Sequence, residues 1–129
     1  MSKQHQEWLK QADYDMDTAR FMLKGGRHFY AIFMCHLSIE KPLKGVYVQR
    51  LGKEPPKIHN LIYFVENLKL SVPEDLHDFI FTLNRVSVPT RYPDDLERIL
   101  KDYTRAKTLA ALKKGAEVLK WLKAMLQER

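Results

Sequence analysis

The chain has 129 residues, of which 45% are hydrophobic and 29% charged, and its formal net charge is +6 at pH 7. A chain of this length predicts one domain, residues 1–129, which buries about two-thirds of its unfolded surface and therefore needs no disulfide or metal to fold. The single cysteine, Cys35, and the lack of any signal-peptide or membrane-spanning run are typical of a soluble protein of the reducing cytoplasm, without a membrane partner.

Two long helices are predicted in the first half of the chain. Apolar residues recur every three or four positions from Trp8 to Leu23, which predicts an amphipathic helix over about residues 4–24 that Gly25-Gly26 terminates. A second helix is predicted over residues 27–51, and it should lie at the centre of a bundle because it is apolar on two sides. Its apolar-side residues are Ile32, His36, Ile39, Leu43 and Val46 on one side, and Tyr30, Phe33, Leu37 and Val48 on the other.

The second half of the chain predicts two short helices and a long final one. Pro55-Pro56 breaks the chain, a third helix follows from Ile58 to Leu68, and Ser71-Val-Pro-Glu74 has the capping-box pattern that opens a fourth. Thr104 is expected to cap the final helix, whose predicted inward residues are Leu109, Leu112, Ala116, Leu119, Leu122 and Leu126. No segment alternates like a strand, so the predicted fold is all-α: an antiparallel helical bundle of four to five main helices plus short extra helices.

Charged residues interrupt the apolar pattern of the second predicted helix. Glu40 and Lys44 are four apart in the order that favours an ion pair, and Lys41 lies one turn before Lys44. Such charges cost free energy in an apolar stripe unless they are paired. Two interpretations stay open: a structural Glu40–Lys44 pair between helices, or a cleft in which Lys41 and Lys44 hold a phosphate. Pro42 lacks the N–H that would bond the Ser38 carbonyl and is expected to kink this helix.

His59 and the segment Arg91-Tyr92-Pro93-Asp94 supply the other candidate site residues. His59 is expected in the first turn of the third helix, where the helix dipole favours a neutral imidazole acting as base or acceptor; alternatively, it fastens the preceding loop by hydrogen bonding. Pro93 and Asp94 are typical of a helix start, so Arg91 presents a cation from a loop, either to an acid such as Glu40 or to a phosphate. Tyr92 offers a ring to a base.

Two surface features are predicted from composition. Residues 101–129 carry eight Lys or Arg against three Asp or Glu, and this stripe is either a solvated helix face or an attraction for phosphates or an acidic partner. The second feature is an excess of large aromatic side chains, which cannot all fit inside so small a bundle: Phe21, Phe29, Tyr30, Phe33 and Tyr47. Exposed patches of this kind normally mark an interface, so we expect a homodimer.

Several chemistries are excluded by their missing motifs. The chain has no Gly-rich phosphate loop and no paired Cys/His zinc spacing. Asp13 and Asp17 lie one turn apart on a helix, an arrangement more typical of a solvated edge than of a metal site. We therefore expect no metal and no cofactor.

The order of short motifs along the chain closely resembles that of the HEPN family (higher eukaryotes and prokaryotes nucleotide-binding). These motifs are the Ala12-Asp13 to Ala19 helix, Gly25-Gly26-x-x-Phe29-Tyr30, Glu40-Lys41-x-x-Lys44, Pro55-Pro56-x-x-His59-x-Leu61, Arg91-Tyr92-Pro93-Asp94 and Glu117-Val118. The resemblance implies a helical bundle that dimerises. Many relatives pair with a small nucleotidyltransferase as toxin and antitoxin, and many of the toxins are metal-independent ribonucleases that use Arg, four to six residues, and then His.

That ribonuclease motif is absent, because no arginine has a histidine at the required distance; Arg50, for example, has eight residues before His59. The leading hypothesis is a non-catalytic HEPN-type binding subunit for a small nucleotidyltransferase, a nucleotide, or both. Its proposed ligand-binding residues are Lys41, Lys44, His59, Arg91 and Tyr92, with Glu40 and Asp94 as a structural polar cluster. The alternatives are a metal-independent ribonuclease acting on RNA through a non-standard site of His59, Arg91 and lysines, and a pure dimerisation module.

Overall fold

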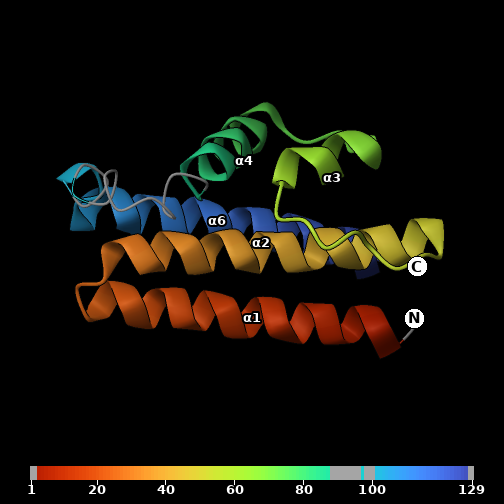
Figure 1. The fold of residues 1–129 in the computed structure, drawn as a ribbon, viewed down its shortest axis with the longest axis horizontal. Helices are drawn as coiled ribbons and strands as arrows, with labels where there is room; N and C mark the ends of the chain where they lie inside the picture. Colours follow the sequence, from red (N-terminus) through yellow and green to blue (C-terminus); the bar gives the residue numbers. More distant parts are fainter. Residues whose placement is uncertain (1–2, 88–96, 98–100, 128–129) are drawn as a thin grey trace.

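The computed structural model describes residues 3–87, 97 and 101–127, and over these residues it shows five helices and no strand (Figure 1). The helices are α1 (Lys3–Lys24), α2 (His28–Leu51), α3 (Leu61–Asn67), α4 (Glu74–Ser87) and α6 (Arg105–Gln127). The predicted all-α helical bundle is therefore confirmed. No helix in the described part of the chain is both long and apolar enough to span a bilayer.

Glycine ends the first helix, as its sequence predicts. Gly26 adopts the left-handed conformation (φ 78°), the amide of Arg27 donates to the carbonyl of Met22, and the amide of Gly26 donates to that of Leu23. These two bonds form a Schellman motif, which satisfies carbonyls that the helix leaves unpaired. The chain then reverses, so that α1 and α2 lie side by side in opposite directions (Figure 1).

Helix α2 is the central element of the bundle and packs against all four other helices. The predicted inward side, from Ile32 to Val46, is buried along its whole length, whereas Tyr30 on the other side is exposed. Helix α6 runs in the same direction as α2, because the crossing through α3 and α4 returns the chain to the end at which α2 begins (Figure 1). The side chains between α1, α2 and α6 form the core, with Met16, Ile39 and Leu122 among its fully buried members.

Helix α3 begins later than the sequence predicts. It starts at Leu61 because the side chain of Asn60 accepts a hydrogen bond from the amide of Tyr63 (3.1 Å) and so acts as its N-cap. Asn84 of α4 reinforces this start by accepting from the amide of Leu61 (2.8 Å) and donating to Asn60 (3.2 Å). His59 therefore precedes α3, and the expectation that it lies in the first helical turn is wrong.

Two further details of the helices differ from expectation. The predicted capping box does not form. Helix α4 begins at Glu74, and the amide of His77 donates to the carbonyl of Pro73, so Ser71 lies too far before the helix to be its N-cap. In α6 Thr104 does cap the helix by accepting from the amide of Lys107 (3.2 Å). Leu109, however, is 40% exposed, because it lies one turn from both Arg105 and Lys113 on the outer face, and Thr108 is buried instead.

Candidate functional site

The candidate site is centred on Glu40, a carboxylate in the middle of α2 that is only 2% exposed. Its neighbours on the same helix are set by local geometry: His36 lies one turn before it and Lys44 one turn after it, so all three share one face of α2. The ammonium of Lys44 is 3.0 Å from one carboxylate oxygen, and the Nε2 atom of His36 is 3.6 Å from the other. The buried Glu40 carboxylate therefore lies between the side chains of His36 and Lys44 on this face of α2.

The fourth member of the cluster, His59, comes from the loop that precedes α3. Its Nδ1 atom is 3.0 Å from each oxygen of the Glu40 carboxylate. Its backbone carbonyl is held from the other direction, because Nε2 of His36 lies 2.7 Å from that oxygen. Helix α2 therefore fixes both the main chain and the ring of His59. We call Glu40, His36, Lys44 and His59 the Glu40 cluster.

These contacts determine where the protons lie. An ionised carboxylate only accepts hydrogen bonds, so Nδ1 of His59 is an N–H donor to Glu40. A backbone carbonyl also only accepts, so Nε2 of His36 is an N–H donor to His59. In a neutral His59 ring the lone pair is consequently on Nε2, on the edge turned away from Glu40. The side chain of His59 is 56% exposed, which leaves that edge accessible to solvent.

Glu40 stays ionised despite its burial. Burial opposes the charged form, but donors on His36, Lys44 and His59 outweigh it and lower the pKa of Glu40 from 4.5 to about 2. The carboxylate is therefore negative throughout the neutral range. Its charge is offset within the chain by Lys44, so the cluster is a satisfied ion pair with an oriented imidazole at its edge.

The structure brings only part of the predicted set of residues together. Lys44 and His59 both contact Glu40, and the Glu40–Lys44 ion pair is the one that the structural interpretation expects. Lys41 instead pairs with Asp15 of α1, with 2.8 Å between Nζ and Oδ2. Arg91, Tyr92 and Asp94 lie outside the residues that the structure describes.

His36 is the member that sequence reasoning assigned to the core rather than to the site. The signal that could have identified it is the spacing of His36, Glu40 and Lys44, each four residues from the next. A histidine in an apolar stripe reads as a core residue unless its partner is known, and here the partner carbonyl belongs to His59, 23 residues away.

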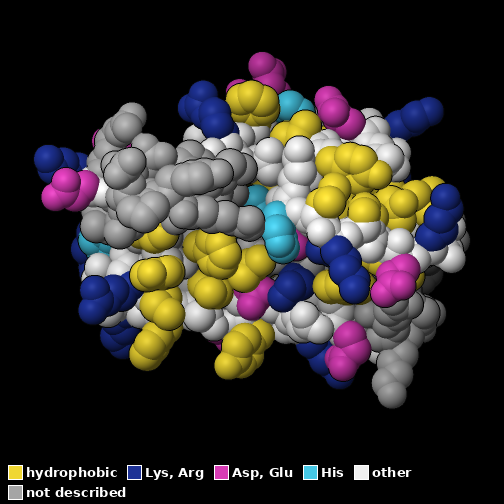
Figure 2. Space-filling view, in the orientation of Figure 1, with side chains coloured by type: hydrophobic (Ala, Val, Ile, Leu, Met, Phe, Trp, Pro, Cys, Tyr) yellow, Lys and Arg dark blue, Asp and Glu magenta, His cyan; other side chains and the backbone are white. Residues whose placement is uncertain are grey.

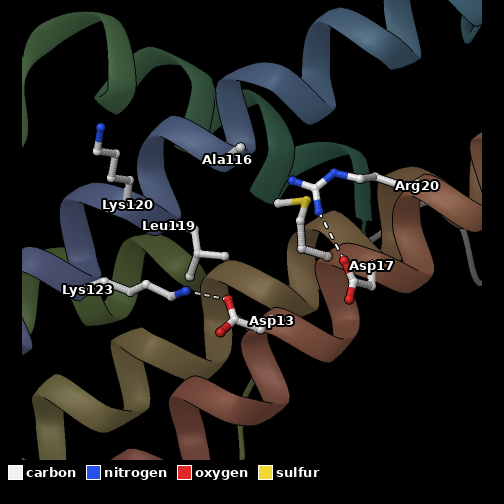
Figure 3. Close-up of a pocket in the computed structure, with 8 residues that line it drawn as sticks. Asp13, Asp17, Arg20, Ala116, Leu119, Lys120 and Lys123 are labelled. Atoms are coloured by element: carbon white, nitrogen blue, oxygen red, sulfur yellow. Dashed lines mark hydrogen bonds and ion pairs between the residues drawn. The ribbon is translucent and has the colours of Figure 1, made fainter.

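A second polar feature is a shallow pocket of about 380 Å³ between α1 and α6 (Figure 3). Met16, Ala116 and Leu119 are the apolar part of its lining. Asp13 pairs across the helices with Lys123, and Asp17 pairs with Arg20 on its own helix, while Lys120 points away from both pairs (Figure 3). The prediction of a solvated edge for the two aspartates agrees with these exposed ion pairs. Within the described residues no group of His, Cys, Asp or Glu side chains is arranged to hold a metal ion.

The third feature is an apolar surface. Tyr14 and Phe21, two turns apart on α1, are 74% and 73% exposed, and Tyr30 at the start of α2 is 55% exposed. We call these three residues the aromatic face. Figure 2 shows hydrophobic side chains gathered over the halves of α1 and α2 next to the turn that joins them. Of the aromatic residues that the sequence predicts to be too many for the core, Phe29 and Tyr47 are buried, whereas Phe21 and Tyr30 are exposed.

The five described helices, with the Glu40 cluster on the central helix α2, define the class of protein: an all-α bundle built around a long second helix. The chain belongs to the HEPN family, because the model of the HEPN domain matches residues 5–125. Among solved structures it is similar to the protein TT1696 from Thermus thermophilus, with a TM-score of 0.81 and 26% identity over 95% of this chain and 98% of that one. It has the same fold as ST0689, an archaeal HEPN homologue, with a TM-score of 0.75 and 24% identity over 98% and 100% of the two chains. A search of curated proteins found no significant match.

Proposed function

We propose that this chain is a non-catalytic HEPN-type binding subunit that pairs with a small nucleotidyltransferase in a toxin–antitoxin-like module, binds a nucleotide, or does both. The observation that carries the proposal is the aromatic face, because large apolar side chains exposed together on a small protein are typical of an interface. The Glu40 cluster supports binding over catalysis, since its buried charge is already neutralised by Lys44. Family membership supports the choice of partner.

The first expected result is a homodimer formed through the aromatic face. Light scattering at micromolar concentration should give about twice the chain mass of 15.3 kDa. Phe21→Glu should shift the mass to that of one chain, because it places a charge in the interface. Phe81→Glu is the matched control: Phe81 is 52% exposed but lies on α4, and this variant should stay dimeric. A wild-type mass of one chain would refute the dimer.

The nucleotidyltransferase part of the proposal is tested by the neighbouring genes. We expect an adjacent small open reading frame that contains a Gly-Ser-x-x-x-x-x-x-Asp-x-Asp pattern. Its product should co-purify with this chain when the two are expressed together, and the complex should elute as one species in size-exclusion chromatography. If the two proteins elute separately at micromolar concentration, this partner is wrong.

The ligand part of the proposal assigns Lys41, Lys44, His59, Arg91 and Tyr92 to a phosphate-bearing ligand. A charge-assisted hydrogen bond contributes on the order of 1.5–3 kcal/mol, so two or three suffice for micromolar affinity. Calorimetric titration with nucleoside triphosphates should show binding that Arg91→Ala and Lys44→Ala each weaken at least about tenfold. Lys113→Ala, on the exposed face of α6, is the control. Affinity unchanged by both site variants would mean that these charges only orient the helices.

A second candidate function is a metal-independent ribonuclease, and the observation that favours it is the orientation of the His59 ring by Glu40. A carboxylate that holds one imidazole nitrogen leaves the other free to act as a base. The Arg–His pair of the known toxins is nevertheless absent from the sequence. We therefore expect no cleavage of generic single-stranded RNA in the presence of a chelator. Cleavage that His59→Ala abolishes would replace the first proposal with this one.

A further inference from the structure

The Glu40 cluster contains an atom whose chemistry goes beyond a binding role: Nε2 of His59. The Nδ1 edge of the His59 ring faces the Glu40 carboxylate, and Glu40 is only 2% exposed. The His59 side chain itself is 56% exposed. The neutral ring therefore carries its lone pair at Nε2, on the exposed edge. A histidine that only fastened a loop would need no ionised carboxylate behind it, because the His36 hydrogen bond already holds the His59 main chain.

A carboxylate at Nδ1 changes what Nε2 can do. When Nε2 attacks an electrophile the ring becomes positively charged, and an N–H donor to a buried carboxylate stabilises that charge where it develops. Glu40 contributes this contact through both of its oxygens at 3.0 Å, and its ionised state is maintained by Lys44. The ring is also held in one orientation, so little ordering is required at the moment of reaction.

The surroundings of the ring favour an anionic reagent. The loop that carries His59 holds two exposed lysines, Lys53 and Lys57, against one exposed acid, Glu54. Local positive charge raises the concentration of anions near the surface.

We propose that Nε2 of His59 is a phosphoryl acceptor that takes its group from a small activated donor, such as an acyl phosphate or a phosphoramidate. The Nε2 lone pair forms the new N–P bond. The bond from phosphorus to the leaving group breaks, and the leaving group, a carboxylate or an amine, departs with the electron pair. The proton on Nδ1 stays shared with Glu40, and the positive charge that the ring gains lies between this carboxylate and the phosphoryl oxygens. This modification requires neither the partner nor the nucleotide proposed above, but it uses the His59 side chain that the ligand proposal also assigns.

The test uses the full chain and acetyl phosphate, with phosphoramidate as a second donor, at about pH 8, where a histidine of ordinary acidity is neutral. Intact-mass spectrometry should show the addition of one phosphoryl group that is lost on acid treatment, and peptide mapping with ³¹P NMR should assign it to Nε2 of His59. His77 is a matched internal control, because it is exposed on α4 and its side chain has no partner among the described residues. His59 should react at least about tenfold faster than His77.

The role of Glu40 is tested by Glu40→Gln, which keeps the size of the side chain and an acceptor for Nδ1–H but removes the charge. The rate at His59 should fall at least about tenfold, while the rate at His77 in the same molecule stays unchanged and shows that the donor is intact. Circular dichroism of the variant shows that the fold is intact. Long-range ¹H–¹⁵N correlation in the wild type should show a protonated Nδ1 and an unprotonated Nε2, a readout that needs no variant. Equal labelling of His59 and His77, an unaltered rate in Glu40→Gln, or a protonated Nε2 at this pH would each overturn the proposal.

Discussion

Replacing Glu40 by leucine is expected to lower the free energy of unfolding by about 3–5 kcal/mol, the range found when one partner of a buried ion pair is removed. The physical reason is that Lys44, only 8% exposed, would keep its charge without a partner, and the His59 ring would lose its acceptor. Urea denaturation followed by circular dichroism measures the effect. A loss below about 1 kcal/mol would show that the cluster is not an ion pair in solution.

Two control variants separate charge from packing. Glu66→Leu makes the same replacement at an exposed position of α3 and should change stability by no more than about 0.5 kcal/mol. The double variant Glu40→Leu/Lys44→Leu removes both charges together, so it should recover much of the loss, because no unpaired ammonium remains buried.

The same carboxylate makes stability depend on pH in a defined direction. Since the pKa of Glu40 falls from 4.5 to about 2 on folding, the unfolded chain takes up the proton first as the pH is lowered. Its contribution, about 3 kcal/mol, is fully present above about pH 5.5 and is lost as the pH falls from there through about 2. The stability difference between wild type and Glu40→Gln should therefore shrink toward zero over this window. A difference that is independent of pH would contradict the assignment.

The second large effect is expected at Gly115, where α6 packs against Cys35 of α2. A Cβ atom at this position would overlap the Sγ atom of Cys35 and lie 3.5 Å from Cε of Met16. Cys35 is fully buried, and burial raises the pKa of its thiol to about 12, so it is a neutral packing group. Gly115→Ala should therefore destabilise the fold by about 1–3 kcal/mol, although alanine has the higher helix propensity.

The rescue variant identifies the cause of that loss. Cys35→Ala removes the sulfur atom that the new methyl group would meet, so Gly115→Ala should be neutral or stabilising in the Cys35→Ala background. Thermal and urea unfolding of the four proteins in this cycle measure the coupling. Gly25→Ala is the comparison at a helix end, where the nearest atom to a new Cβ is 3.5 Å away and no overlap arises. If the effects of the Gly115 and Cys35 substitutions on stability are additive, overlap between the new methyl group and the Cys35 sulfur is not the cause of the loss.

The sequence predicted most of the fold because helices depend on local patterns. The 3.6-residue periodicity located α1, α2 and α6 to within a few residues, and Gly26 ended α1 as expected. The start of α3 was predicted three residues too early, because its cap depends on Asn84, which reaches Asn60 from another helix. Leu109 was predicted to face inward because periodicity gives the width of an apolar face only approximately. In the structure it lies at the outer edge of that face and is 40% exposed.

In the candidate site, the sequence by itself determined that Glu40 and Lys44 are neighbours, because residues four apart on a helix lie close together whatever the rest of the chain does, and the structure shows that they pair. Only the tertiary structure decided that His59 donates to Glu40, that His36 holds the His59 carbonyl, and that Lys41 pairs with Asp15 instead. These partners are 19 to 26 residues apart in the chain. Their meeting depends on how α1 and the loop before α3 pack against α2, and a buried charge takes whichever partner that packing places within reach.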